Sequence, residues 1–170
     1  MICIQLKDEA MNRKEAYTIK YNVKFNDDTH KEAFYKYLKE LHVDINDVYR
    51  IALVYVLTIT EDCRNRFYDC YDIQDCCVKQ EALHHGWVTG TDARAIRMAF
   101  NLFNGGVPTA LIESGDPEDN LYDRRKQFRY REYELLRSTP CELFGYSSEC
   151  RYFIEGIKLR FPEIFPEIYE

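Results

Sequence analysis

The stretch "NDVYRIALVYVLTI" (Asn46–Ile59) decides the fold of this chain. Its apolar residues fall on nearly every side of a helix, so little polar surface is left to face water. A helix of this kind is stable only where other elements cover it. We therefore predict a helix from Asp47 to about Ile59, capped by Asn46, at the centre of the domain.

Helical patterns continue on both sides of this stretch. Before it, Thr29 and Glu32 have the spacing of a capping box, in which the two side chains satisfy free N–H groups at a helix start. After it, Thr60 begins a short helix. The inward-facing residues of these two helices are expected at the helical spacing. They are Ala33, Phe34, Tyr37, Leu38 and Leu41 in the first helix, and Cys63, Phe67, Cys70 and Tyr71 in the second.

Further helices are predicted after an irregular segment at residues 72–90. The first of them stops at "NGG" (Asn104–Gly106), because glycine adopts the left-handed conformation that ends helices. Pro162 ends the last one. The expected ranges are Thr91 (as cap) to Phe103, Asp116 (as cap) to Arg137, Thr139–Gly145 and Ser148–Phe161. The core stripe expected in the last helix is Cys150, Phe153, Ile154, Ile157 and Phe161.

The N-terminal residues show a different period. "ICIQL" (Ile2–Leu6) and "YTIKYNVKF" (Tyr17–Phe25) alternate apolar and polar residues, as half-buried strands do. The polar residues between them can close an antiparallel hairpin. We therefore predict a mainly α fold, a compact orthogonal array of about six helices with an N-terminal β-hairpin. The chain would form a single domain, residues 1–170, in which a hairpin at 1–25 is added to a helical core at 26–170.

Composition restricts the class of protein. The net charge of −6 argues against a generally basic protein that coats nucleic acid. The longest apolar run, Ile51–Leu57, is far too short to span a membrane, and the first residues lack the features of a secretory signal peptide. We therefore expect a cytoplasmic protein with no membrane partner, whose seven cysteines stay reduced.

No metal and no cofactor is predicted. The cysteines include no C-x-x-C pair of the kind that zinc sites use. Asp69, Asp72 and Asp75 precede the pair His84–His85, but their spacing matches no recognised set of metal ligands. The sequence also lacks a P-loop and a G-x-S-x-G nucleophile motif.

One segment combines the features of a ligand site: "HHGWVTGTDARAIRMAFNLFNGG" (His84–Gly106). Free N–H groups at the start of its helix attract anions, and a glycine between two threonines lets a phosphate come close. Arginines further along the helix would clamp the anion, and the only tryptophan would stack on a ring. The candidate ligand-binding residues are Trp87, Thr89, Gly90, Thr91, Arg94, Arg97 and Asn101.

A structural interpretation of this segment is also open. Thr91 would then be an ordinary helix cap, Trp87 would fill the core, and both arginines would bond to acidic neighbours. The two interpretations differ in the expected effect of Arg97→Ala. A ligand site predicts weaker ligand binding, whereas a structural helix start predicts a lower melting temperature.

A second candidate surface lies in "YDRRKQFRYREY" (Tyr122–Tyr133), which interleaves basic and aromatic residues. Nucleic-acid binding favours this mixture, because cations neutralise phosphates and rings stack on bases. Acidic residues dilute the charge, and Leu121, Phe128 and Leu135 recur every seven residues, so a solvated amphipathic helix explains the pattern as well. The residues of this candidate basic–aromatic surface are Arg124, Arg125, Arg129 and Tyr130.

Four blocks of the sequence resemble a small bacterial and phage family of unknown function: "FNDDTHKEAFYKYL", "ALVYVLTITEDCRNRFYDCYDI", "ALHHGWVTGTDARAIRMAFNLFNGG" and "YFIEGIKLRFPE". The resemblance covers roughly Phe25 to Glu163, and W-x-T-G-T followed by "AFNLFNG" is its most specific part, with "IKLRFPE" the matching block near the C-terminus. It implies no activity. It suggests a chain encoded by a bacterium, its phage or a mobile element.

These observations favour a binding or regulatory protein over an enzyme. The partner would be a host protein or a nucleotide-like ligand, and one role of such small phage or mobile-element proteins is counter-defence. The alternative is an enzyme that acts on a phosphate-bearing substrate, a nucleotide or nucleic acid, at Thr89-Gly90-Thr91. Nucleic acid is a less favoured partner, and a homodimer is compatible with the sequence. A deep pocket would support a ligand, and a flat tyrosine-rich face would support a protein partner.

Overall fold

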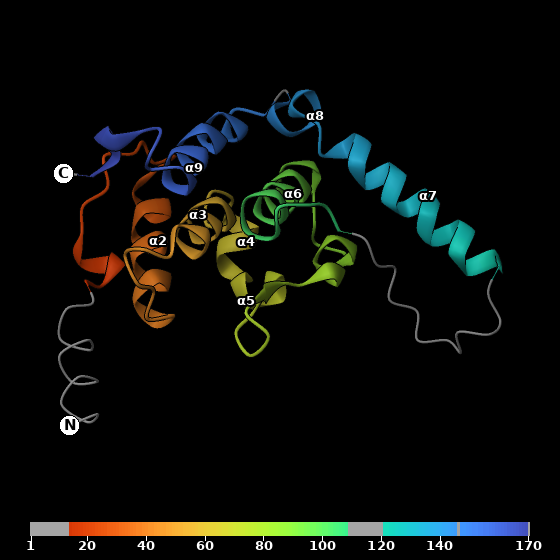
Figure 1. The fold of residues 1–170 in the computed structure, drawn as a ribbon, viewed down its shortest axis with the longest axis horizontal. Coiled ribbons are helices and arrows are strands. Elements are labelled where there is room, and N and C mark those ends of the chain that lie inside the picture. The colour runs from red at the N-terminus through yellow and green to blue at the C-terminus, as the bar shows by residue number, and fades with distance from the viewer. Residues whose placement is uncertain (1–13, 109–120, 146, 170) are drawn as a thin grey trace.

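The computed structural model describes residues 14–108, 121–145 and 147–169, with the backbone alone at 121–127. The described chain is mainly helical (Figure 1). The α-helices are α2 (Asp28–Glu40), α3 (Val48–Leu57), α4 (Glu61–Asn65), α5 (Phe67–Cys70), α6 (Gly90–Asn104), α7 (Leu121–Arg137), α8 (Pro140–Phe144) and α9 (Phe153–Arg160). Short 3₁₀ turns are η1 (Ala16–Thr18), η2 (Gln80–His84), η3 (Glu149–Tyr152) and η4 (Pro166–Ile168).

The apolar helix α3 is the centre of the core, as the sequence predicts. It packs against α2, α6 and α9, and every residue from Ile51 to Leu57 is buried. Asp47 caps it by accepting a hydrogen bond from the backbone N–H of Arg50, one residue later than the predicted cap. Gly156 of α9 lies so close that a Cβ there would be 2.7 Å from a methyl group of Val56. This glycine therefore permits the close approach of α9 to α3.

The predicted N-terminal hairpin is wrong for Tyr17–Phe25, and Ile2–Leu6 lies outside the described residues. The segment holds the turn η1 and one isolated β-bridge, from Tyr21 to Tyr169. Its alternation has another cause. Every second side chain packs onto the helical core while the chain runs extended over it, and none of the strands among the described residues pairs along it. The inward residues are Ile19, Tyr21, Val23 and Phe25.

The hairpin of the described chain lies in the segment that the sequence suggests is irregular. Strands β1 (Tyr71–Asp72) and β2 (Cys77–Val78) pair antiparallel, with Tyr71 opposite Val78. The Asp72 carboxylate accepts hydrogen bonds from the backbone N–H groups of Gln74 and Asp75, which forms the turn. Each strand has only two residues, which is too few for an alternation of apolar and polar residues to be recognised in the sequence.

Helix α6 starts earlier than predicted. Its N-cap is Thr89 and not Thr91, and Asp92 completes a capping box with Thr89. Its C-cap is Gly105 in the left-handed conformation, with φ of 67°, so the predicted stop at Asn104–Gly106 is confirmed. The apolar face of α6 packs on α3.

The last helical segment differs in register from the prediction. It begins as η3 and continues as α9. A 3₁₀ turn has about three residues per turn, so it rotates the following helix relative to a continuous α-helix. Cys150 and Phe153 are buried as expected, but Ile154 is 45% exposed.

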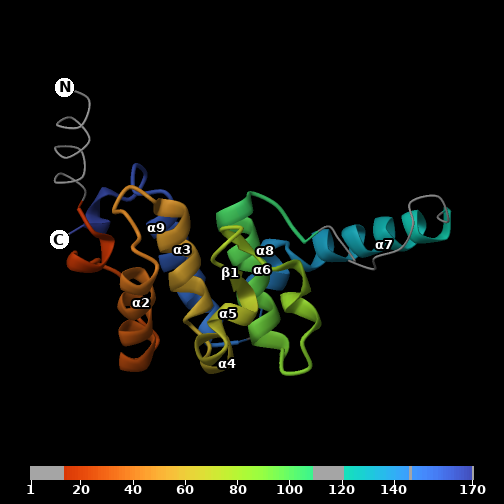
Figure 2. The same ribbon diagram turned by 90° about the horizontal axis from the view of Figure 1, so that it is seen from below.

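Helix α7 stands apart from the other helices. Both views show it extending away from the body beyond α8 (Figures 1 and 2). Among the described residues, no helix has both the length and the apolar character that crossing a membrane requires.

Candidate functional site

A pocket of about 300 Å³ opens where the N-terminus of α6 meets α7 and α8. Its wall combines aliphatic side chains from the segment before α6 with arginines from two helices. This size is at the lower end for small-molecule sites. The lining residues are Leu83, Val88, Thr89, Gly90, Ala93, Arg94, Arg97, Tyr133, Arg137 and Glu142.

The structure brings together part of the predicted ligand site. Thr89, Gly90, Arg94 and Arg97 line the pocket. The other three candidates face elsewhere and have other contacts. Thr91 donates its hydroxyl to Ser147 (3.2 Å), Asn101 donates its amide to the carbonyl of Arg97 (2.9 Å), and Trp87 stacks on His85 beneath Arg66.

The start of α6 already holds an acid. One carboxylate oxygen of the buried Asp92 accepts hydrogen bonds from the backbone N–H (3.0 Å) and the hydroxyl (2.6 Å) of Thr89. A carboxylate in the first turn compensates the positive end of the helix. Attraction for a ligand anion must therefore come mainly from the arginines.

Arg97 is bound to a buried acid. Its guanidinium makes two parallel contacts to the carboxylate of Glu134 on α7, from Nε to Oε2 (2.6 Å) and from Nη2 to Oε1 (2.9 Å). The Glu134 side chain is only 2% exposed and that of Arg97 11%. This is the geometry that the structural interpretation of Arg97 expects, because the pair joins α6 to α7 and neutralises the arginine.

Arg94 keeps donors available to the pocket. Its Nε–H donates to the carbonyl oxygen of Glu142 (2.8 Å), which holds the guanidinium against α8. Gly145 makes room for it, since a Cβ there would lie 2.8 Å from Arg94 Nε. Within the described chain, the two terminal nitrogens of Arg94 have no hydrogen-bond or ion-pair partner.

Arg137 and Tyr133 form the outer wall. Arg137 pairs with the Glu142 carboxylate at 2.9 Å, and both side chains are nearly half exposed. Its guanidinium also lies over the Tyr133 ring, 5.3 Å from the centroid. An exposed pair of this kind is weak and can rearrange when a stronger anion arrives. The three guanidinium groups around the pocket have carboxylates close by: Glu134 pairs with Arg97 and Glu142 with Arg137, and Asp92 lies at the start of α6.

The candidate basic–aromatic surface is divided. Arg129 is exposed on α7, whereas the Tyr130 side chain turns towards the body, with its hydroxyl 3.2 Å from Nε2 of His84. Burial raises the pKa of Tyr130 to about 12. The side chains of Arg124 and Arg125 lie outside the described residues. Arg129 and Tyr130 therefore belong to different faces of the helix.

Comparison with known families gives one result. The family model described as "Family of unknown function (DUF6075)" matches residues 20–168, which include the whole described pocket. The chain belongs to this family. The resemblance inferred from the sequence blocks is thus confirmed. Neither a curated protein nor a solved structure matches the chain.

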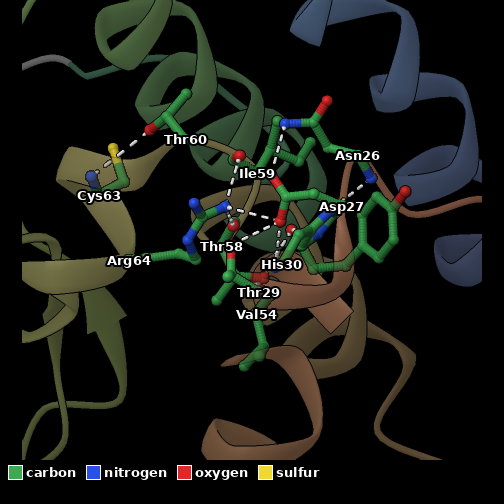
Figure 3. Close-up of polar contacts among 11 residues, drawn as sticks. Asn26, Asp27, Thr29, His30, Val54, Thr58, Ile59, Thr60, Cys63 and Arg64 are labelled. Carbon is green, nitrogen blue, oxygen red and sulfur yellow. Dashed lines mark hydrogen bonds and ion pairs between the residues drawn. The ribbon is translucent and has the colours of Figure 1, made fainter. Parts of the chain in front are cut away.

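Sequence reasoning missed a buried histidine of this DUF6075 chain. His30 is fully buried between the start of α2 and the end of α3 (Figure 3). Its Nδ1 accepts the backbone N–H of Asn26 (3.1 Å), so its Nε2 carries the proton and donates to the carbonyl of Tyr55 (3.1 Å). Burial lowers the pKa of His30 to about 4. The signal was present, because His30 precedes Phe34 by one helical turn on the apolar stripe of α2.

Arg64 completes this polar cluster. Its Nη1 donates to the carbonyl oxygens of Thr58 (3.0 Å) and Ile59 (2.9 Å), which follow the last residue of α3 (Figure 3). A cation at this end of a helix satisfies free carbonyl groups and compensates the helix dipole. His30 and Arg64 both donate to backbone carbonyls of the protein itself, so we assign the cluster a structural role. In the described part of the chain, no group of three or more His, Cys, Asp or Glu side chains is placed to hold a metal ion.

Proposed function

We propose that this chain is a cytoplasmic binding or regulatory protein that holds a small phosphate-bearing anion, such as a nucleotide-like signal, in the pocket at the start of α6. The observation that carries this proposal is Arg94. Its terminal N–H groups have no partner in the described chain, and they lie beside Gly90 at the wall of a pocket that two further arginines line.

The lining residues suit binding in a specific way. A phosphate oxygen would accept charge-assisted hydrogen bonds from the Arg94 Nη groups, which Glu142 and Gly145 hold in place. Arg137 can exchange its exposed pair with Glu142 for a second contact. The Tyr133 ring offers an aromatic wall for a base or another ring.

The same lining supports binding better than catalysis. Glu142 is the carboxylate that lines the described pocket, and it is paired with Arg137. Asp92 is committed to Thr89. General-base or nucleophilic catalysis needs a free base within hydrogen-bond reach of the reacting group, and the described wall does not offer one. We therefore prefer a binding function to the alternative of an enzyme at Thr89-Gly90-Thr91.

A thermal-shift titration tests the proposal. Inorganic phosphate, nucleoside phosphates and cyclic nucleotides are added separately to the natural chain, to Arg94→Met and to Arg151→Met. Arg151 is an exposed arginine that does not line the pocket, so it serves as the matched control. At about a hundred times Kd, a ligand should raise Tm by roughly 5–10 °C. Loss of a charge-assisted bond in Arg94→Met should weaken binding about ten- to a hundredfold.

The outcome is decisive in either direction. Stabilisation of the natural chain and of Arg151→Met, but not of Arg94→Met, supports the pocket. If no phosphate-bearing compound stabilises the natural chain, the proposed ligand class is wrong.

The second candidate function is binding to a host protein, including a counter-defence role for a phage or mobile element. Exposed tyrosines favour it, because tyrosine is enriched in protein interfaces. Among the tyrosines whose side chains the structure describes, those exposed by more than a third are Tyr49, Tyr68, Tyr133 and Tyr169. Native mass spectrometry of the chain purified from its own host would distinguish a retained stoichiometric protein from a retained small anion.

A further inference from the structure

Two of the three arginines that line the pocket at the start of α6 are already paired with a carboxylate. Arg97 pairs with Glu134 at 2.6 Å, and Arg137 pairs with Glu142 at 2.9 Å. Arg94 instead donates its Nε–H to the backbone carbonyl of Glu142, which carries no charge. Among the described residues, Arg94 is therefore the arginine of the pocket wall that no carboxylate neutralises.

A second negative charge on a ligand would meet carboxylates in this pocket. Glu142 lines the pocket, and its carboxylate contacts Arg137, another residue of the wall. Asp92 places a further carboxylate at the start of α6. If Arg137 leaves Glu142 to contact the ligand, the Glu142 charge is left unpaired nearby, so the sum of charges does not change. Because like charges repel strongly at short range, the wall suits a ligand with one negative charge.

Phosphate compounds differ in the number of charges that they carry. A phosphodiester has a single ionisable oxygen, so it carries one negative charge at any pH near neutrality. A phosphate monoester has a second pKa of about 6, so its charge at pH 7 is about −1.5 to −2, and nucleoside triphosphates carry more. A phosphodiester therefore matches the single unpaired cation, Arg94.

The size and the apolar part of the wall restrict the ligand further. The pocket volume of about 300 Å³ is at the lower end for small-molecule sites, which favours a ligand the size of one nucleotide. The Tyr133 ring and the aliphatic side chains of Leu83 and Val88 offer an apolar wall for an aromatic base. Charge and size thus indicate one phosphodiester and one base.

We propose that the pocket selects a nucleoside cyclic monophosphate, a phosphodiester of single-nucleotide size, and that Glu142 determines this specificity. This inference rests on the proposed function, because it requires that the same pocket binds phosphate. The two parts of Glu142 act differently. Its backbone carbonyl holds Arg94 in place, whereas its carboxylate repels a ligand that carries a second charge.

Isothermal titration calorimetry with three probes tests the selection by charge. The probes are the 3′,5′-cyclic monophosphate, the 5′-monophosphate and the 5′-triphosphate, in an adenosine series and in a guanosine series. At about pH 7.5 the natural chain should bind a cyclic monophosphate roughly tenfold more tightly than the monophosphate with the same base. The triphosphate should bind more weakly than either.

Glu142→Gln separates the two parts of this residue. It keeps the backbone carbonyl that holds Arg94 and nearly the same side-chain shape, but it removes the charge. The monophosphate should then bind within about twofold of the cyclic monophosphate. The matched control is Glu32→Gln, which makes the same change at an exposed position of α2 and should keep the full preference. Circular dichroism checks that both variants fold.

A lower pH provides a second measurement that needs no variant. At about pH 5.5 most of the monophosphate carries a single charge, whereas the cyclic monophosphate does not ionise in this range. The preference of the natural chain should therefore fall from roughly tenfold to about twofold or less. The cyclic monophosphate reports any change in affinity that comes from titration of the protein itself.

The outcomes distinguish this inference from the proposed function. If the monophosphate or the triphosphate binds the natural chain as tightly as the cyclic monophosphate, selection by charge is wrong. It is also wrong if Glu142→Gln leaves the preference unchanged. In both cases the pocket still binds phosphate, so the proposed function is retained. If none of the probes binds the natural chain, the proposed function fails and this inference fails with it.

Discussion

At the scale of single residues, His30 links stability to pH. It is buried with both ring nitrogens bonded in the neutral form, and its pKa is lowered by burial from 6.5 to about 4. The charged groups that face it are Arg64 and Asp27. Because the unfolded chain binds the proton at higher pH, protonation favours unfolding. The contribution of His30 is complete above pH 6.5 and is lost as the pH falls towards 4.

We therefore expect the free energy of unfolding to fall by up to about 3 kcal/mol between neutral pH and pH 4 through His30 alone. Urea denaturation across this range measures it. His30→Gln removes the titrating group, so its stability should be lower at neutral pH but should depend less on pH. An equal slope in His30→Gln and the natural chain would show that other groups cause the acid sensitivity.

Only some of the residues that line the candidate site could be predicted from the sequence. The Thr-Gly-Thr turn and its two arginines indicated a pocket at the start of α6, and Arg94 lines the pocket found there. The sequence could not tell that Arg97 meets Glu134, because 37 residues separate them along the chain. Nor could it place Arg137 and Glu142 in the same wall, since that depends on how α7 and α8 return to α6.

At the scale of elements, local signals predicted most helices. Caps, glycine stops and apolar stripes act within one or two turns, so they are visible in the sequence. The central helix α3, the start of α4 at Thr60 and the end of α6 at Gly105 all agree with the structure. The errors arose where an extended segment imitated a strand and where η3 changed the register of α9. The N-caps of α2, α3 and α6 are Asp27, Asp47 and Thr89, each one or two residues away from the predicted cap.

The joint between α6 and α7 carries a prediction of its own. Arg97→Ala would leave the buried Glu134 carboxylate without its counter-charge, which costs about 3–5 kcal/mol. We expect Tm to fall by roughly 10 °C or more. The exposed pair of Arg137 and Glu142 is the matched control, and Arg137→Ala should cost less than about 1 kcal/mol.

A double variant separates the two reasons why Arg97 could matter for stability. Arg97→Met with Glu134→Leu removes the buried charge as well as its partner, so it should recover most of the lost stability in urea denaturation. If Arg97→Ala costs no more than Arg137→Ala, the buried pair does not hold α7 in place.

At the scale of the whole molecule, the mainly helical character followed from the sequence, but the site did not. The helical character can be read from the spacing of apolar residues within each segment, one segment at a time. The pocket depends on three helices and the segment before α6 meeting at one point, through Arg97–Glu134, Arg94–Glu142 and Arg137–Glu142. Two of these three contacts join α6 to later parts of the chain, and spacing along a sequence does not record such distances.

If the proposed function holds, ligand binding should affect several helices at once, because the pocket is built from α6, α7 and α8. An anion that bonds to Arg94 on α6 and Arg137 on α7 would connect two helices that otherwise meet through a few polar contacts. Phosphate should therefore slow backbone hydrogen exchange at the start of α6, the end of α7 and α8, while α2, which lies away from the pocket, stays unchanged. Mass spectrometry of exchanged peptides measures this, and Arg94→Met should show no protection. If phosphate raises Tm but leaves α7 and α8 unprotected, the anion binds the chain at another site.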